Sequence, residues 1–145
     1  TMPFVKGSDF LLMNSDVFYD ANIVKGLLAS EEKNMVACEY GSYIEESMKI
    51  CVNDKGEITH ISKQINSEEA YATSIDVYKI GIEAGNILFD KAIDIIEKQG
   101  NYNSWTEVAL DKIFSKIKFY PYKIEGRWYE IDNHQDLAAA EKLFT

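Results

Sequence analysis

Two aspartates stand at the ends of segments that are typical of buried strands. Asp16 follows the apolar run at residues 10–13, and Asp132 follows residues 127–131. In open α/β sheets, ligands bind outside the carboxyl ends of the strands. Magnesium is usually held by one or two carboxylates together with substrate phosphates. Asp16 and Asp132 are therefore a candidate metal pair, on the condition that their two strands run close together.

A simpler interpretation exists for each aspartate. Asp16 ends the turn-prone triplet Asn14-Ser15-Asp16, and Asp132 stands beside Asn133, which is suited to cap the last helix. From the pattern alone, turns and caps are the commoner role of such residues. The choice between the two interpretations depends on the elements that position the aspartates.

Those elements alternate between strands and helices. Apolar or alternating segments predict strands at residues 10–13, 34–40, 48–52, 57–63, 71–80, 118–124 and 127–131. The first of these runs is typical of a strand buried on both faces, as in a parallel sheet covered by helices. The turn at residues 53–56 predicts that the strands on either side of it pair as an antiparallel hairpin. Together the segments predict an α/β fold with a mixed sheet.

Local residues mark the ends of the predicted helices, which begin at Asp20, near Ile82, at Ser104 and at Asn133. Gly100 is expected to end the second helix, which spans residues 82–99. Ser104 and Glu107 have the spacing of a capping box at the start of the third, which runs to about residue 116. No linker or shift in composition divides the chain, so residues 1–145 are expected to form a single domain.

Composition and charge argue against several functional classes. The formal net charge is −9, with 15 Lys and Arg against 24 Asp and Glu, so the basic surface of a nucleic-acid-binding protein is not expected. No apolar run approaches the roughly 18–20 residues of a membrane span, and the first residues do not resemble a signal peptide. Cys38 and Cys51 lack metal-ligand spacing and are expected to be buried free thiols in a reducing compartment, the cytoplasm.

Four segments, in order along the chain, resemble the nucleoside-triphosphate-dependent nucleotidyltransferases. Residues 11–20 resemble their apolar run followed by Asn or Gly, any residue, Asp and Val. Residues 48–63 are similar to their hairpin, with M-K-V, then G-x-I, then a lysine. Residues 104–110 resemble their W-x-E-x-A-L helix, and residues 128–141 their terminal W-x-E-I-D segment. The similarity covers nearly the whole chain and is strongest to the phosphocholine and phosphonate cytidylyltransferases, followed by sugar-1-phosphate enzymes.

The resemblance implies a Rossmann-like mixed sheet with flanking helices, of the nucleotide-diphospho-sugar transferase type. It implies that Asp16 and Asp132 bind the catalytic Mg²⁺ and that Lys63 faces the phosphate of the acceptor. Four further side chains are implied to lie near the non-phosphate end of the acceptor: Trp105, Glu107, Trp128 and Tyr129.

Each of these residues also has a structural alternative. Lys63 could be a solvated lysine at a strand end, and Glu107 could serve the helix cap alone. The aromatic side chains could pack in the core. If they line the acceptor site, they could form a cation–π cradle for a quaternary ammonium such as choline, with a stabilisation of about 0.5–2 kcal/mol.

The opening segment of the family has no counterpart in this sequence. Its glycine-rich signature with Arg and Lys is missing, as is most of its base-binding region. Because backbone N–H groups of that loop cradle phosphate, the chain is expected to be an N-terminally truncated, C-terminal part of a nucleotidyltransferase that binds nucleotide poorly alone. A truncated sheet would expose an edge through which a homodimer could form.

The function implied by the resemblance is transfer of a nucleotidyl group from a nucleoside triphosphate, expected to be CTP, to a phosphorylated small molecule. A phosphate oxygen of a phosphocholine-like acceptor would attack the α-phosphorus and release pyrophosphate, with charge neutralised by Mg²⁺ on Asp16 and Asp132 and by Lys63. Two alternatives stay open: a sugar 1-phosphate as the acceptor, or a nucleotidyltransferase-like module that binds without catalysis.

Overall fold

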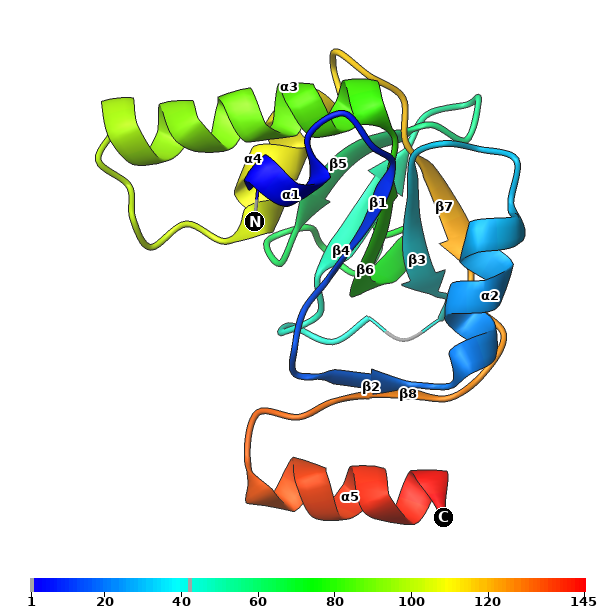
Figure 1. Cartoon of the computed structure of the whole chain (residues 1–145). Coiled ribbons are helices and arrows are strands. Elements are labelled where there is room, and N and C mark those ends of the chain that lie inside the picture. Colours follow the sequence, from blue (N-terminus) through cyan, green and yellow to red (C-terminus); the bar gives the residue numbers. More distant parts are fainter. Residues whose placement is uncertain (1, 42) are drawn as a thin grey trace.

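The computed structural model describes residues 2–41 and 43–145, which form a mixed α/β fold (Figure 1). Its elements, in chain order, are α1 (Met2–Val5), β1 (Phe10–Met13), β2 (Val17–Tyr19), α2 (Ala21–Ala29), β3 (Met35–Glu39), β4 (Lys49–Val52), β5 (Ile58–Ser62), β6 (Ala72–Ile80), α3 (Ile82–Ile93), the π-helical turn η1 (Asp94–Lys98), α4 (Thr106–Ile113), β7 (Tyr120–Lys123), β8 (Trp128–Glu130) and α5 (His134–Phe144).

The main sheet has the strand order β5-β4-β6-β3-β7. β1 also pairs with β6, along the same edge of β6 that β4 occupies. The β3–β7 pair is parallel, whereas β6 pairs antiparallel with β1, β3 and β4. The predicted mixed sheet is therefore confirmed. The prediction for residues 10–13 is wrong in two respects, because β1 runs antiparallel to β6 and is only partly buried.

The central strand β6 separates two apolar layers. Its Tyr78 and Ile80 face a large core that α3, η1 and α4 cover, whereas Ile75 and Val77 face a smaller core beneath α2. Side chains alternate between the faces of a strand, so the apolar residues of β6 serve both layers. Burial on both faces explains why seven of the nine residues of β6 are buried, and it makes β6 a rigid support for the residues at its ends.

A second, two-stranded ribbon lies apart from the main sheet. Its strands β2 and β8 pair antiparallel, with Val17 opposite Glu130 and Tyr19 opposite Trp128. Figure 1 shows this ribbon at one end of the main sheet, with α5 on its far side. The sequence predicts β8, within residues 127–131, but not β2, whose three residues lie between the turn-prone triplet at residues 14–16 and the helix expected from Asp20.

The local predictions have mixed outcomes. The hairpin of β4 and β5 is confirmed as an antiparallel pair, and Asn133 caps α5 by accepting hydrogen bonds from the backbone N–H groups of Gln135 and Asp136. Gly100 adopts a left-handed φ of 65° just after the second helix, as expected. The capping box at Ser104 is wrong, because the helix begins one residue later with Trp105 at its N-cap and no side-chain cap bond.

Asp20 also does not cap α2 through its side chain. Its carboxylate instead binds Arg127, whose Nη2 lies 2.9 Å from Asp20 Oδ1. The thiols of Cys38 and Cys51 are both free, but Cys38 alone is buried, and burial raises its pKa. Among the described residues, none of the helices has the length and apolar character that would let it cross a bilayer.

Candidate active site

The β2–β8 ribbon brings Asp16 and Asp132 together. Asp16 directly precedes β2, and Asp132 lies two residues after the end of β8. The backbone N–H of Ile131 donates a hydrogen bond of 2.8 Å to the carbonyl oxygen of Asp16, which extends the ribbon to the two aspartates. Pairing of the two segments therefore meets the condition on which the candidate metal pair depended.

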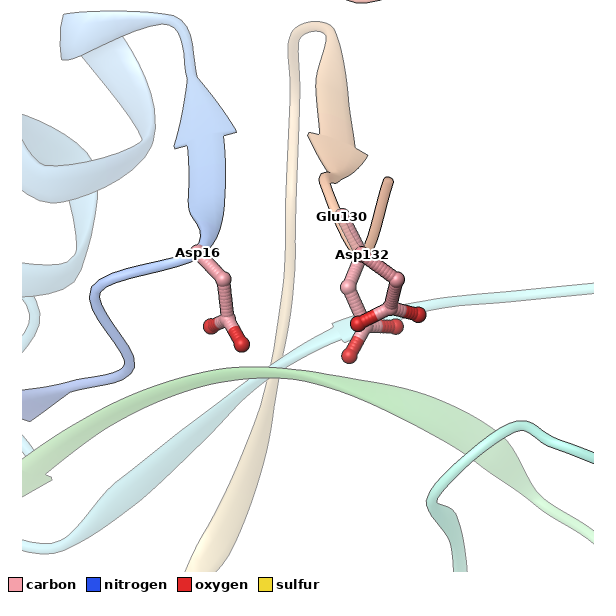
Figure 2. Close-up of side chains that lie close together, drawn as sticks. All are labelled: Asp16, Glu130 and Asp132. Carbon is pink, nitrogen blue, oxygen red and sulfur yellow. The ribbon is translucent and has the colours of Figure 1, made fainter. Parts of the chain in front are cut away.

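Glu130 joins the two aspartates in one acidic group. Single carboxylate oxygens of Asp16, Glu130 and Asp132 all lie within 4.8 Å of one another, and all three residues are exposed. Figure 2 shows Asp16 entering from one strand of the ribbon and the other two from the opposite strand. The sequence interpretation missed Glu130, although its spacing of two residues from Asp132 places both side chains on one face of an extended segment.

Like charges dominate this acidic group. Partial desolvation of its carboxyl group raises the pKa of Glu130, the charges of Asp76 and Asp132 raise it further, and the charge of Lys63 opposes the shift. Asp132 is held in place by its own N–H, which donates a 3.1 Å hydrogen bond to Asp136 Oδ2. A cation placed among these carboxylates would offset the repulsion that raises the pKa of Glu130.

Two cavities meet at the acidic group. The larger cavity has a volume of about 480 Å³ and the smaller one of about 360 Å³. Both are lined by Met48, Lys63, Asp76, Glu130 and Asp132. Within the described part of the chain, Lys63 is the one basic side chain in either lining, so both cavities are strongly acidic.

Lys63 follows β5 and reaches the wall that the two cavities share. Its Nζ lies 4.9 Å from the centre of the Trp105 ring. Trp105, the N-cap residue of α4, is 60% exposed, so this cation–π contact is made at the surface rather than in the core. The structure thus brings together two residues that the sequence interpretation assigned to different ends of the acceptor.

The four residues expected near the non-phosphate end of the acceptor fall into two groups. Trp105 and Glu107 line the smaller cavity, whereas Trp128 and Tyr129 line the larger one. Glu107 is 5% exposed and accepts a 2.8 Å hydrogen bond from the hydroxyl of Tyr78. Glu107 therefore has a buried partner in place of the expected helix cap. Neither of the two cavities is lined by all four residues.

Asp76 is a second residue that the sequence interpretation missed as a site residue. It lines both cavities and has a φ of 57°, in the left-handed region. The hydroxyl of Tyr78 lies 2.9 Å from Asp76 Oδ1, so this hydroxyl stands between the carboxylates of Asp76 and Glu107. Burial and then the charge of Glu107 raise the pKa of Asp76, against the lowering effect of hydrogen bonds from Tyr78 and Ser74.

Comparisons with known proteins give structural matches alone. No protein-family model and no curated protein sequence matches the chain. Its structure is similar to that of the inositol-1-phosphate CTP transferase of T. maritima, with a TM-score of 0.71, 19% identity, and coverage of 97% of this chain and 56% of that one. It is also similar to the CTP:phosphocholine cytidylyltransferase of Streptococcus pneumoniae (TM-score 0.67, 16% identity, coverage 93% and 57%) and to a UTP-bound UGPase of Acinetobacter baumannii (TM-score 0.72, 9% identity, coverage 98% and 52%).

These similarities establish the fold. The expected fold of the nucleotide-diphospho-sugar transferase type is confirmed, because the chain shares its fold with these three solved structures. The chain spans between 52% and 57% of the length of those three proteins.

Proposed function

We propose that the chain forms the metal-binding and acceptor-binding part of a nucleotidyltransferase. The reaction transfers a nucleotidyl group from a nucleoside triphosphate to a phosphorylated small molecule and releases pyrophosphate. The observation that carries the proposal is the convergence of Asp16, Glu130 and Asp132 at the two cavities. These carboxylates come from segments far apart in the sequence, in a fold shared with enzymes of this class.

The acidic group fits a magnesium ion. Mg²⁺ takes oxygen ligands at about 2.0–2.1 Å in octahedral geometry, so oxygens on opposite sides of the ion are about 4.2 Å apart. Only one pair of three ligands can lie across the ion, and neighbouring ligands are about 3 Å apart, so carboxylate oxygens within 4.8 Å of one another would move closer together to share it. Asp16 and Asp132 are the proposed principal ligands, and Glu130 is the third. The ion would supply neutralisation of the charge on the phosphate oxygens.

Lys63 is proposed to bind the phosphate of the acceptor. Its ammonium is the one positive charge in the described linings of the two cavities, and it is beside the acidic group. A lysine acts on phosphate as a compact point charge. In that position Lys63 would hold the acceptor oxygen in line with the α-phosphorus, and such orientation supplies much of the rate in phosphoryl-type transfer.

A phosphocholine-like acceptor fits the lining of the larger cavity. Trp128 and Tyr129 supply aromatic surface there, and Glu39 and Glu46 supply negative charge. Aromatic faces and carboxylates are the groups that bind a quaternary ammonium. A sugar 1-phosphate is the second candidate, because UGPase structures share the fold. CTP is the proposed donor, since two of the similar structures are CTP-dependent enzymes.

The nucleotide-binding part of the reaction is assigned to residues outside these 145. The sequence has no glycine-rich phosphate loop, and the structure spans 52–57% of the similar proteins. The test is therefore made on two proteins: this chain, and a longer one that joins it to a segment with such a loop. Pyrophosphate release is measured with Mg²⁺ and CTP, and with phosphocholine or glucose 1-phosphate as the acceptor.

The longer protein is expected to turn over phosphocholine, and Asp132→Asn is expected to slow it by about 100-fold or more, because a charge-neutralising contact is lost. Glu125→Gln, which changes an exposed carboxylate outside both cavities, is the matched control. Turnover with glucose 1-phosphate but not with phosphocholine would show that the acceptor is a sugar phosphate. Absence of turnover with either acceptor and any nucleoside triphosphate would favour a binding module.

A further inference from the structure

Asp76 adopts an unusual conformation for a residue inside a central strand. Its φ is 57°, in the left-handed region that is strained for L-residues and that Asp tolerates better than most. The register between β3 and β6 shifts at the same place, since Val36 faces Tyr78 while Cys38 faces Ser74. Such bulges redirect a side chain out of the alternation of the strand. Here the redirected carboxylate lines both cavities.

The redirected Asp76 holds Asn14 at two points. The backbone N–H of Asn14 donates a 3.1 Å hydrogen bond to the carbonyl oxygen of Asp76. The side-chain amide of Asn14 donates a second one, also of 3.1 Å, to Asp76 Oδ2. Asn14 begins the turn that leads from β1 to Asp16, so this double contact fixes the turn that presents a proposed metal ligand.

The other carboxylate oxygen of Asp76 is also occupied inside the protein. Oδ1 accepts a 2.9 Å hydrogen bond from the hydroxyl of Tyr78 and a 3.2 Å bond from Ser74 Oγ. The oxygen of the same Tyr78 hydroxyl lies 2.8 Å from Oε1 of the buried Glu107, so its single proton is shared between the two carboxylates. Asp76 is therefore locked by the strand that carries it and by α4, and it does not belong to the group of carboxylates that converge within 4.8 Å.

We propose that Asp76 is a positioning residue of the metal site and acts through Asn14 on Asp16. The inference rests on the proposed function, because it requires that Asp16 binds a divalent cation. Mg²⁺ and Mn²⁺ need oxygen ligands within a few tenths of an ångström of fixed positions, so a loosened Asp16 turn weakens binding without removing a ligand. Losing a residue that orients a metal ligand typically costs 10–100-fold in affinity.

The test is Mn²⁺ binding by the 145-residue chain, followed by electron paramagnetic resonance of the free ion. Asp76→Gly removes the carboxylate and suits the left-handed backbone, and Asn14→Ala removes the amide that Asp76 holds. Each is expected to weaken Mn²⁺ binding by about 10–100-fold. Asp76→Asn keeps an acceptor oxygen for Asn14 and is expected to retain more of the affinity. Thermal unfolding of each variant separates loss of metal binding from loss of the fold.

The double variant Asn14→Ala with Asp76→Gly tests whether Asp76 acts through Asn14. If Asp76 acts through Asn14, the double variant binds Mn²⁺ no more weakly than either single variant. Additive losses, or wild-type affinity in Asp76→Gly, would overturn the inference and leave the metal site intact. Asp16→Asn is measured beside them, because wild-type affinity there overturns the metal site and the proposed function as well. If Asp76→Gly does not fold, Asn14→Ala alone still tests the inference, because wild-type Mn²⁺ affinity in that variant overturns it.

Discussion

The backbone N–H of Ile131 donates a 2.8 Å hydrogen bond to the carbonyl oxygen of Asp16. This bond is the last of the β2–β8 ribbon and fastens the two segments directly beside their carboxylates. A metal ligand set built from distant segments is only as rigid as the pairing that joins them. The ribbon therefore has a functional consequence, because it fixes the separation of the proposed ligands before a metal arrives.

Divalent cations are expected to stabilise the folded chain through Glu130 as well as the two aspartates. Ligand at about 100 times its dissociation constant adds about 2.7 kcal/mol to the free energy of unfolding. Mg²⁺ or Mn²⁺ should raise the thermal midpoint of the wild type, and Glu130→Gln should reduce that rise by more than half. The measurement is thermal unfolding with and without metal, with Glu125→Gln as the control. An unchanged rise in Glu130→Gln would remove Glu130 from the ligand set.

Replacement of Lys63 is expected to weaken binding of the acceptor but not of the nucleotide. Lys63→Gln should raise the KM for phosphocholine at least about 10-fold, the effect of one lost charged hydrogen bond, and leave the KM for CTP unchanged. Lys63→Arg keeps the charge and should recover part of the loss. The readout is steady-state kinetics of pyrophosphate release by the longer protein. A rise in the KM for CTP alone would place Lys63 on the donor side.

Lys49 is expected to stabilise the loop at residues 44–47. Its side chain is 2% exposed, and Nζ donates hydrogen bonds of 3.0–3.2 Å to the carbonyl oxygens of Ile44, Glu45 and Ser47. Lys49→Met leaves these acceptors without their donor, so it should lower the free energy of unfolding by about 2–4 kcal/mol.

Urea unfolding measures the effect of Lys49→Met, and Lys55→Met in an exposed turn is the control, with an expected change within about 0.5 kcal/mol. Because the loop also lines the larger cavity, Lys49→Met should weaken phosphocholine binding by the longer protein. A loss of stability no larger than that of the control would show that the carbonyl groups find water in place of the ammonium.

The contact between Asp20 and Arg127 is expected to make the free energy of unfolding depend on pH in the acidic range. Hydrogen bonds from the Arg127 side chain and backbone lower the pKa of Asp20 below its usual value of 3.8. A carboxyl whose pKa is lower in the folded state stabilises the fold above its unfolded value, and this stabilisation is lost as the pH falls below it. Asp20→Asn should therefore be less stable than the wild type at neutral pH.

The difference between Asp20→Asn and the wild type should be constant from pH 7 to about pH 5 and should shrink as the pH falls through and below 3.8. Urea unfolding at each pH measures it. A difference that grows on acidification would contradict the assigned direction of the Asp20 shift.

Much of the fold could be predicted from the sequence because its causes are local. The β4–β5 hairpin follows from a turn flanked by alternating residues, and Asn133 caps α5 through N–H groups two and three residues away. The helical segment after β6 ends at Lys98, two residues before Gly100, where glycine tolerates a left-handed φ. Asp16 and Asp132 could be singled out because their motifs lie within single segments.

The tertiary structure decided the features whose causes lie far away in the chain. β2 is a strand because β8 pairs with it, and that pairing adds Glu130 to the two aspartates. The pairing register between β3 and β6 shifts near Asp76, so the Asp76 side chain departs from the alternation of side chains between the two faces of β6. In this position its carboxylate reaches Asn14. Glu107 meets the spacing of a capping box, yet its hydrogen-bond partner is the hydroxyl of Tyr78 on β6. Short-range spacing specifies which residue types are available, whereas pairing between distant strands determines which of them face one another.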